Sequence, residues 1–216
     1  MKQQLTNLVL FKLGWLACVL FAVAGQPVWS AASVAAVAVL HLLIVPIATK
    51  EAILLAAAAV IGLAWESALV ATGMVTYPAA AGASSMAPYW IVAMWVLFAT
   101  TINHGLRWIK KSWAIAMAAG AVGGPLAFYS GAAMGAVEFG NTPLALAVIG
   151  AGWAVLLPLL VLISDTIIDS EWLEPGLNEA KSIEKKLALT VLGRQLRSRR
   201  TQRHSWKQTR SKGRRL

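Results

Sequence analysis

Long apolar runs separated by short polar connections make up the first 164 residues of the chain. Four stretches contain no Lys, Arg, Asp or Glu, namely 13–40, 52–65, 112–137 and 139–164. A membrane-spanning helix needs only about 20 mostly apolar residues, so windows of about that length predict six spans. The spans are expected near 5–25, 28–48, 52–72, 88–106, 112–137 and 143–164. Because open strands would leave unpaired amides in hydrocarbon, the pattern predicts an all-α, polytopic transmembrane helical bundle.

The charges between the spans predict which way the bundle faces. The connections at 25–27 and 73–87 carry no charge, and the connection at 138–142 carries only Glu138. The N-terminus and the other connections hold five basic residues: Lys2, Lys50, Arg107, Lys110 and Lys111. Lys and Arg accumulate on the cytoplasmic side of membrane proteins, so we expect both termini to be cytoplasmic.

After residue 164 the composition changes abruptly. Residues 1–164 carry six basic and three acidic side chains, and 165–216 carry thirteen and six, which divides the net charge of +10 into +3 and +7. The division predicts a six-helix transmembrane domain at 1–164 and a basic cytoplasmic tail at 165–216. Within the tail we expect an amphipathic helix at about 176–196 and a disordered Arg-rich end. A tethered basic segment meets lipid phosphate first, so the expected partner is the anionic headgroup of membrane lipids rather than nucleic acid.

The first apolar run also fits a secretory signal peptide, because Lys2 precedes it and Ala-Val-Ala at 22–24 resembles a cleavage site. Retention as a span is favoured by the bulky Trp15 and Phe21, by the charge of Lys12, and by the apolar run that follows at once.

Several polar residues are expected in the cytoplasmic half of the membrane: Lys12, His41, Asn103, His104 and Arg107. Ionisable groups at this depth are costly and mark candidate functional sites. On a continuous fourth helix, Asn103 and His104 would share a face with Arg107, and the group could bind an anionic headgroup or substrate. A structural interpretation competes with this one. Arg107 would then be a helix-end anchor that reaches lipid phosphate, while Asn103 and His104 hydrogen-bond neighbouring helices.

Glu66 is expected in the outer half of the third span, with no basic residue near it in sequence. It is a candidate for proton coupling, or else a hydrogen-bonded structural carboxyl. Tyr129 is a candidate for bringing a hydroxyl to this region.

Gly124 and Pro125 are expected to break or kink the fifth helix, because proline removes an amide donor and glycine loosens the turn. In a transporter such a break exposes backbone groups to substrate. In a plain bundle it is a kink, and Gly131 and Gly135 form a close-packing surface for a neighbouring helix. The plain bundle is the interpretation that we favour.

Three blocks of the chain, at 7–15, 88–108 and 123–131, resemble an uncharacterised family of small polytopic bacterial inner-membrane proteins. The resemblance covers about residues 5–164, and its most specific part runs from Trp95-Val-Leu-Phe-Ala-Thr-Thr to Leu-Arg-Trp108. It implies location in the bacterial inner membrane as a multi-pass protein, and it transfers a topology but no catalytic role. The resemblance also implies that members of the family occur alongside lipid-modifying enzymes, which points to lipid chemistry.

The sequence shows no CxxC, paired-His spacing, GxGxxG or Walker-type loop, so we expect no cofactor, no metal and no catalytic residues. The leading hypothesis is a non-catalytic scaffold or lipid-interacting accessory of a membrane-associated enzyme system, with a membrane protein or a second copy as a possible partner. The first alternative is a small proton-coupled transporter that uses Glu66 and the broken fifth helix. The second is a lipid-modifying enzyme that uses His41, His104 and Arg107 on a headgroup.

Overall fold

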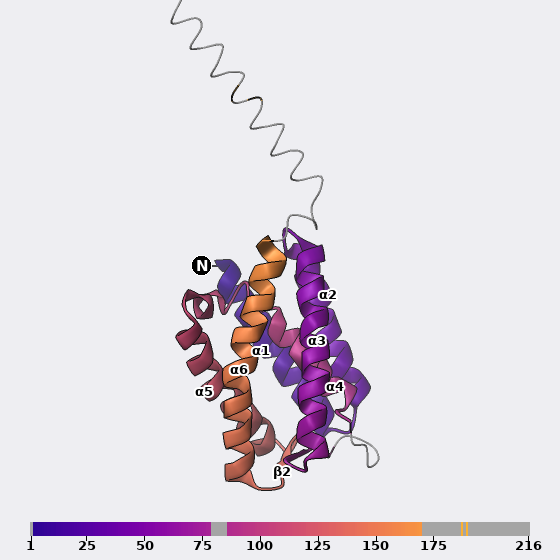
Figure 1. Ribbon diagram of the computed structural model, residues 1–216. Helices are drawn as coiled ribbons and strands as arrows, with labels where there is room; N and C mark the ends of the chain where they lie inside the picture. The colour runs from indigo at the N-terminus through magenta and orange to yellow at the C-terminus, as the bar shows by residue number, and fades with distance from the viewer. Residues whose placement is uncertain (1, 79–85, 170–186, 188, 190–216) are drawn as a thin grey trace, which may run out of the picture. The chain divides into compact units, whose positions relative to one another are not determined.

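Six α-helices account for most of the computed structural model, which describes residues 2–78, 86–169, 187 and 189 (Figure 1). In chain order, with one 3₁₀-helix η1, they are α1 (Lys2–Val23), α2 (Pro27–Ile44), α3 (Ala48–Ala71), α4 (Tyr89–Ala99), η1 (Arg107–Lys111), α5 (Trp113–Ala133) and α6 (Thr142–Asp169). Two strands, β1 (Val75–Thr76) and β2 (Glu138–Phe139), pair antiparallel, with Val75 opposite Phe139. The predicted all-α class is confirmed.

The five helices other than α4 are long and apolar enough to cross a membrane. The start of α1, the α2–α3 connection and the end of α6 lie at one end of the bundle, and β2 lies at the other (Figure 1). We call the end that holds the start of α1 the N-terminal end. The length and composition of the helices make the chain a membrane protein.

The fourth helix is much shorter than the predicted span at 88–106, because α4 ends at Ala99. The hydroxyls of Thr100 and Thr101 donate to the carbonyls of Leu97 and Phe98, at 2.7 and 2.6 Å, in competition with the helical ladder. The amide of Thr101 also turns to Phe98, three residues back. The chain then continues as turns through 100–106 before η1 begins. The prediction of one continuous helix here was therefore wrong.

The fifth helix shows the opposite result, since α5 is continuous from Trp113 to Ala133 and contains Pro125 inside it. The helix is therefore not interrupted at Gly124 and Pro125, and the kink of a plain bundle, which we favoured, stays a prediction. Gly124 is instead a packing position. A Cβ built there would lie 2.4 Å from Cγ of Trp153, so the absence of a side chain lets α6 approach α5.

Gly135 also has a different role from the one expected. It lies beyond the end of α5 with a φ of 83°, and the amide of Ala136 bonds back to the Gly131 carbonyl. This is the geometry of a glycine that terminates a helix. Gly131 and Gly135 therefore do not form one helical packing surface.

The chain divides into two units, Met1–Asp169 and Ser170–Leu216. In the first, α6 extends past the predicted end at residue 164, so Asp165 belongs to the helix. The predicted amphipathic helix at 176–196 and the Arg-rich end lie outside the described residues, apart from 187 and 189.

Candidate functional site

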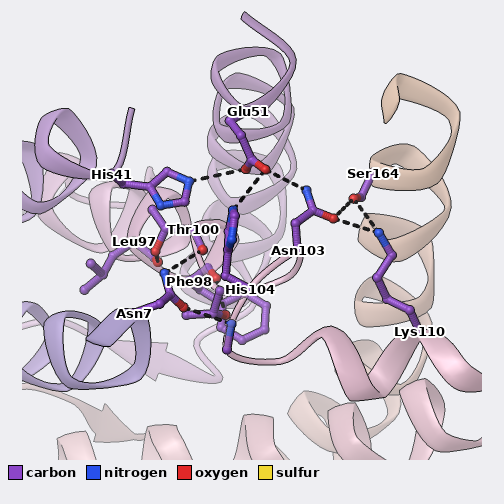
Figure 2. Close-up of polar contacts among 12 residues, drawn as sticks. Asn7, His41, Glu51, Leu97, Phe98, Thr100, Asn103, His104, Lys110 and Ser164 are labelled. Atoms are coloured by element: carbon purple, nitrogen blue, oxygen red, sulfur yellow. Dashed lines mark hydrogen bonds and ion pairs between the residues drawn. The ribbon is translucent and has the colours of Figure 1, made fainter. Parts of the chain in front are cut away.

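A buried carboxylate, Glu51, holds three polar side chains together (Figure 2). It lies in the first turn of α3, near the N-terminal end of the bundle. Nε2 of His41 lies 3.3 Å from Glu51 Oε2, and Nε2 of His104 lies 3.2 Å from Oε1. The amide of Asn103 donates to the same Oε1 at 3.1 Å. His41 is 3% exposed and Glu51 is 8% exposed. We call these four residues the Glu51 cluster.

Local structure explains how the Glu51 cluster forms. His41 lies in the last turn of α2 and Glu51 in the first turn of α3, so the short connection between the helices brings them together. Asn103 and His104 come from the turns that follow α4. In an uninterrupted helix these two neighbours would diverge by about 100° around the axis, whereas in the turns both reach the same oxygen.

Asn103 links the Glu51 cluster to α6 and η1. Its Oδ1 accepts hydrogen bonds from Nζ of Lys110 at 2.7 Å and from Oγ of Ser164 at 2.6 Å. Lys110 also pairs with Asp165 at 2.7 Å. Because Lys110 can only donate, the Asn103 oxygen must face it, which leaves the amide nitrogen facing Glu51.

Asn7 supports the irregular segment 100–106 from α1. Its amide donates to the Thr100 carbonyl at 3.0 Å, and its oxygen accepts from the Gly105 amide at 3.0 Å. Non-helical backbone inside a membrane protein must satisfy its polar groups within the protein. Asn7 therefore satisfies two backbone groups that the end of α4 leaves open.

A small pocket of about 100 Å³ adjoins the two histidines of the Glu51 cluster. Its lining includes His41 and His104 together with Thr6, Asn7 and Thr100. A water molecule needs only about 10–15 Å³ of such space, so the pocket can admit several waters to the imidazoles.

A second hollow region, which we call the lateral groove, is lined mainly by residues of α1, α4, η1, α5 and α6. It consists of two cavities of about 470 and 90 Å³. Five lining residues belong to both cavities, namely Phe11, Trp15, Phe98, Ala127 and Trp153. The larger cavity is also lined by Lys12 and Trp108, and the smaller by Glu66. The groove is thus apolar and aromatic, with Lys12 as a cation in its wall.

Glu66 is 1% exposed and has two donors from other elements. The Tyr77 hydroxyl lies 2.5 Å from Oε2, and Nε1 of Trp95 lies 2.8 Å from Oε1. The hydroxyl therefore comes from Tyr77. Tyr129, which was the expected partner, is 59% exposed.

The structure brings together only part of the predicted site. His41, Asn103 and His104 converge, whereas Lys12 and Arg107 are exposed and are not in the Glu51 cluster. The expectation that Arg107 shares a helical face with Asn103 and His104 was wrong, because Arg107 begins η1 after the turns. Sequence reasoning also missed four contributors: Asn7, Glu51, Lys110 and Ser164. The sequence contains one signal for Glu51: it is a carboxylate between two apolar runs, ten positions after His41.

These features define a polytopic helical membrane protein with a polar cluster beside a non-helical segment. Within that class, the chain belongs to the family described as "Protein of unknown function (DUF2878)", whose model matches residues 4–159. The expected membership of an uncharacterised family is therefore confirmed. No curated protein and no solved structure matches the chain. The matched range contains His41, Glu51 and His104 and ends before Ser164.

Proposed function

We propose that this protein is a lipid-binding accessory component of a bacterial inner membrane, and that it holds an anionic phospholipid in the lateral groove. The observation that carries the proposal is the groove itself, a hollow of about 470 Å³ among helices whose surroundings are lipid. Its occupant must be mostly apolar, because Phe11, Trp15 and Phe98 line it. An acyl chain from the bilayer meets this requirement.

The charge at the groove supports an anionic headgroup. Lys12 is exposed, and its Nζ lies 5.6 Å from the ring centroid of Trp15 and 6.0 Å from that of Phe11. Arg107 is exposed between Leu106 and Trp108, which both line the larger cavity. The two cations match the anionic headgroup of a phospholipid, and the apolar hollow beside them matches its acyl chains. The basic tail adds twelve Lys or Arg residues from Lys185 onward, which favours the anionic cytoplasmic leaflet.

The Glu51 cluster is a poor place for the same headgroup. A carboxylate lies at its centre, and a lipid phosphate there would meet a like charge. The headgroup therefore belongs beside Lys12.

The two alternative functions have less support. The transporter hypothesis depended on Glu66 and on a break in α5, and α5 is continuous. The enzyme hypothesis needed Arg107 beside His41 and His104, and Arg107 is outside the Glu51 cluster.

Lipid retention by the purified full-length protein tests the proposal. We would add phosphatidylglycerol or phosphatidylcholine to delipidated protein in detergent and measure bound lipid by mass spectrometry. The expected result is a preference for phosphatidylglycerol that falls about fivefold in Lys12→Gln, since a charge near a lipid phosphate contributes ~1 kcal/mol. Lys111→Gln is the matched control, because Lys111 is exposed and does not line the groove. Equal losses in both variants, or no headgroup preference in the wild type, would contradict the proposal.

A further inference from the structure

The donor atoms of the Glu51 cluster have the composition of a metal site. We propose that His41, Glu51 and His104 bind a divalent first-row transition metal ion, with Zn²⁺ as the best-fitting probe. The inference does not depend on the lipid proposal, because the cluster and the lateral groove have no lining residue in common. It differs from the expectation of no metal, which was based on the absence of a closely spaced histidine pair from the sequence.

The distances fit one ion. Two donors bound to the same tetrahedral ion at ~2.0–2.1 Å lie about 3.3–3.4 Å apart. His41 lies 3.3 Å from Oε2 of Glu51 and His104 lies 3.2 Å from Oε1, so each imidazole faces its own oxygen of the carboxylate. One ligand atom from each of the three residues lies within 4.8 Å of the others. The ring centroids of His41 and His104 are 5.0 Å apart with planes at 79°. The two imidazole nitrogens lie within 4.8 Å of each other, so they must move closer by up to about 1.5 Å to bind one ion together.

The choice of ion follows from the donor types. Two imidazoles and one carboxylate are the protein ligands of many catalytic zinc sites, and the same set holds non-haem iron. Mg²⁺ and Ca²⁺ prefer all-oxygen sites, so they do not match two nitrogen donors. His41 and Glu51 are both buried, so water reaches the ion only from the side of the adjoining pocket.

The surroundings supply two further requirements of a metal site. Asn103 donates to Glu51 Oε1, and its own oxygen is fixed by Lys110 and Ser164, so the carboxylate has the outer hydrogen bond that metal ligands usually have. The pocket of about 100 Å³ beside His41 and His104 provides a way in and room for a water as the fourth ligand.

The test uses the full-length protein in detergent, purified with a tag that contains no histidine. His204→Ala is introduced throughout, so that His41 and His104 are the only histidines left. Zn²⁺ bound after equilibration and dialysis is measured by mass spectrometry, and the Zn²⁺-dependent rise in Tm is measured in parallel. We expect about one ion per chain and a rise in Tm.

Three variants separate a metal site from a hydrogen-bond network. In His104→Gln the amide can still donate to Glu51 but replaces an imidazole ligand, and in Glu51→Gln the carboxylate is lost. Both should bind Zn²⁺ at least about 100-fold more weakly, because even the loss of an outer partner costs about 10–100-fold. Glu138→Gln is the control, since Glu138 is an exposed carboxylate in β2. The proposal is overturned if the parent protein shows no Zn²⁺-dependent rise in Tm, or if His104→Gln, Glu51→Gln and Glu138→Gln all bind Zn²⁺ as the parent does.

Discussion

Asn7 and Gly105, 98 positions apart in the chain, are joined by a 3.0 Å hydrogen bond from the Gly105 amide to the Asn7 side chain. The same side chain donates to the Thr100 carbonyl. One residue of α1 thus closes the backbone on both sides of the turns that present Asn103 and His104.

Asn7→Ala should destabilise the fold because it leaves these two backbone groups without their partner. A buried polar group that loses its hydrogen bond costs on the order of 1–3 kcal/mol. Thermal unfolding in detergent, followed by circular dichroism, measures the effect. Asn141→Ala is the matched control, since Asn141 accepts from the Leu144 amide at an exposed position before α6 and should cost only about 1 kcal/mol. A loss for Asn7→Ala no larger than that for Asn141→Ala would contradict this role.

Tyr77→Phe should destabilise the protein, because the Tyr77 hydroxyl is one of two donors to the buried Glu66. The expected loss is on the order of 1–3 kcal/mol, which is the cost of an unpaired buried polar group. Tyr129→Phe should change the unfolding temperature little, since that side chain is 59% exposed. If the two variants unfold at the same temperature, Tyr77 does not hold Glu66 in the way the structure describes.

Substitution by alanine should change the stability of the protein in opposite directions at two adjacent glycines of α5. A Cβ at Gly123 would meet nothing within 4 Å, whereas at Gly124 it would lie 2.4 Å from Trp153. Gly123→Ala should stabilise by up to about 1 kcal/mol through helix propensity. Gly124→Ala should destabilise by about 1–3 kcal/mol through overpacking against α6. The two melting temperatures are compared directly, and a stabilising Gly124→Ala would refute the close α5–α6 packing.

The sequence predicted the long helices well because a span of about 20 apolar residues has few alternatives in a membrane. It could not predict the end of α4 at Ala99, since no glycine or proline follows until Gly105 and the backbone is redirected by two threonine hydroxyls. At Pro125 the helix continues where an interruption was one of the two outcomes expected. Proline disfavours a helix interior, yet α5 continues through it while packed closely on α6.

Part of the candidate site was also predictable. Polar residues at membrane depth are rare, so His41, Asn103 and His104 stood out. Glu51 did not, because a carboxylate where an apolar run begins looks like an ordinary interfacial charge. Its meeting with residues from two other segments is a property of the tertiary fold. Lys12 and Arg107 were grouped with the histidines because all of them were expected at the same depth in the membrane. The contacts of a side chain also depend on the side of the helix from which it projects.

The most direct test of the proposed function fills the lateral groove. Gly123 lines the larger cavity and has open space around it, so Gly123→Leu should occupy the groove without disturbing the helices. Val155→Phe is the control, because Val155 is 64% exposed elsewhere on α6. Bound phosphatidylglycerol would be measured by native mass spectrometry on both variants and the wild type. We predict that Gly123→Leu loses most of the bound lipid while Val155→Phe retains it; equal lipid occupancy in all three proteins would contradict a lipid site in the groove.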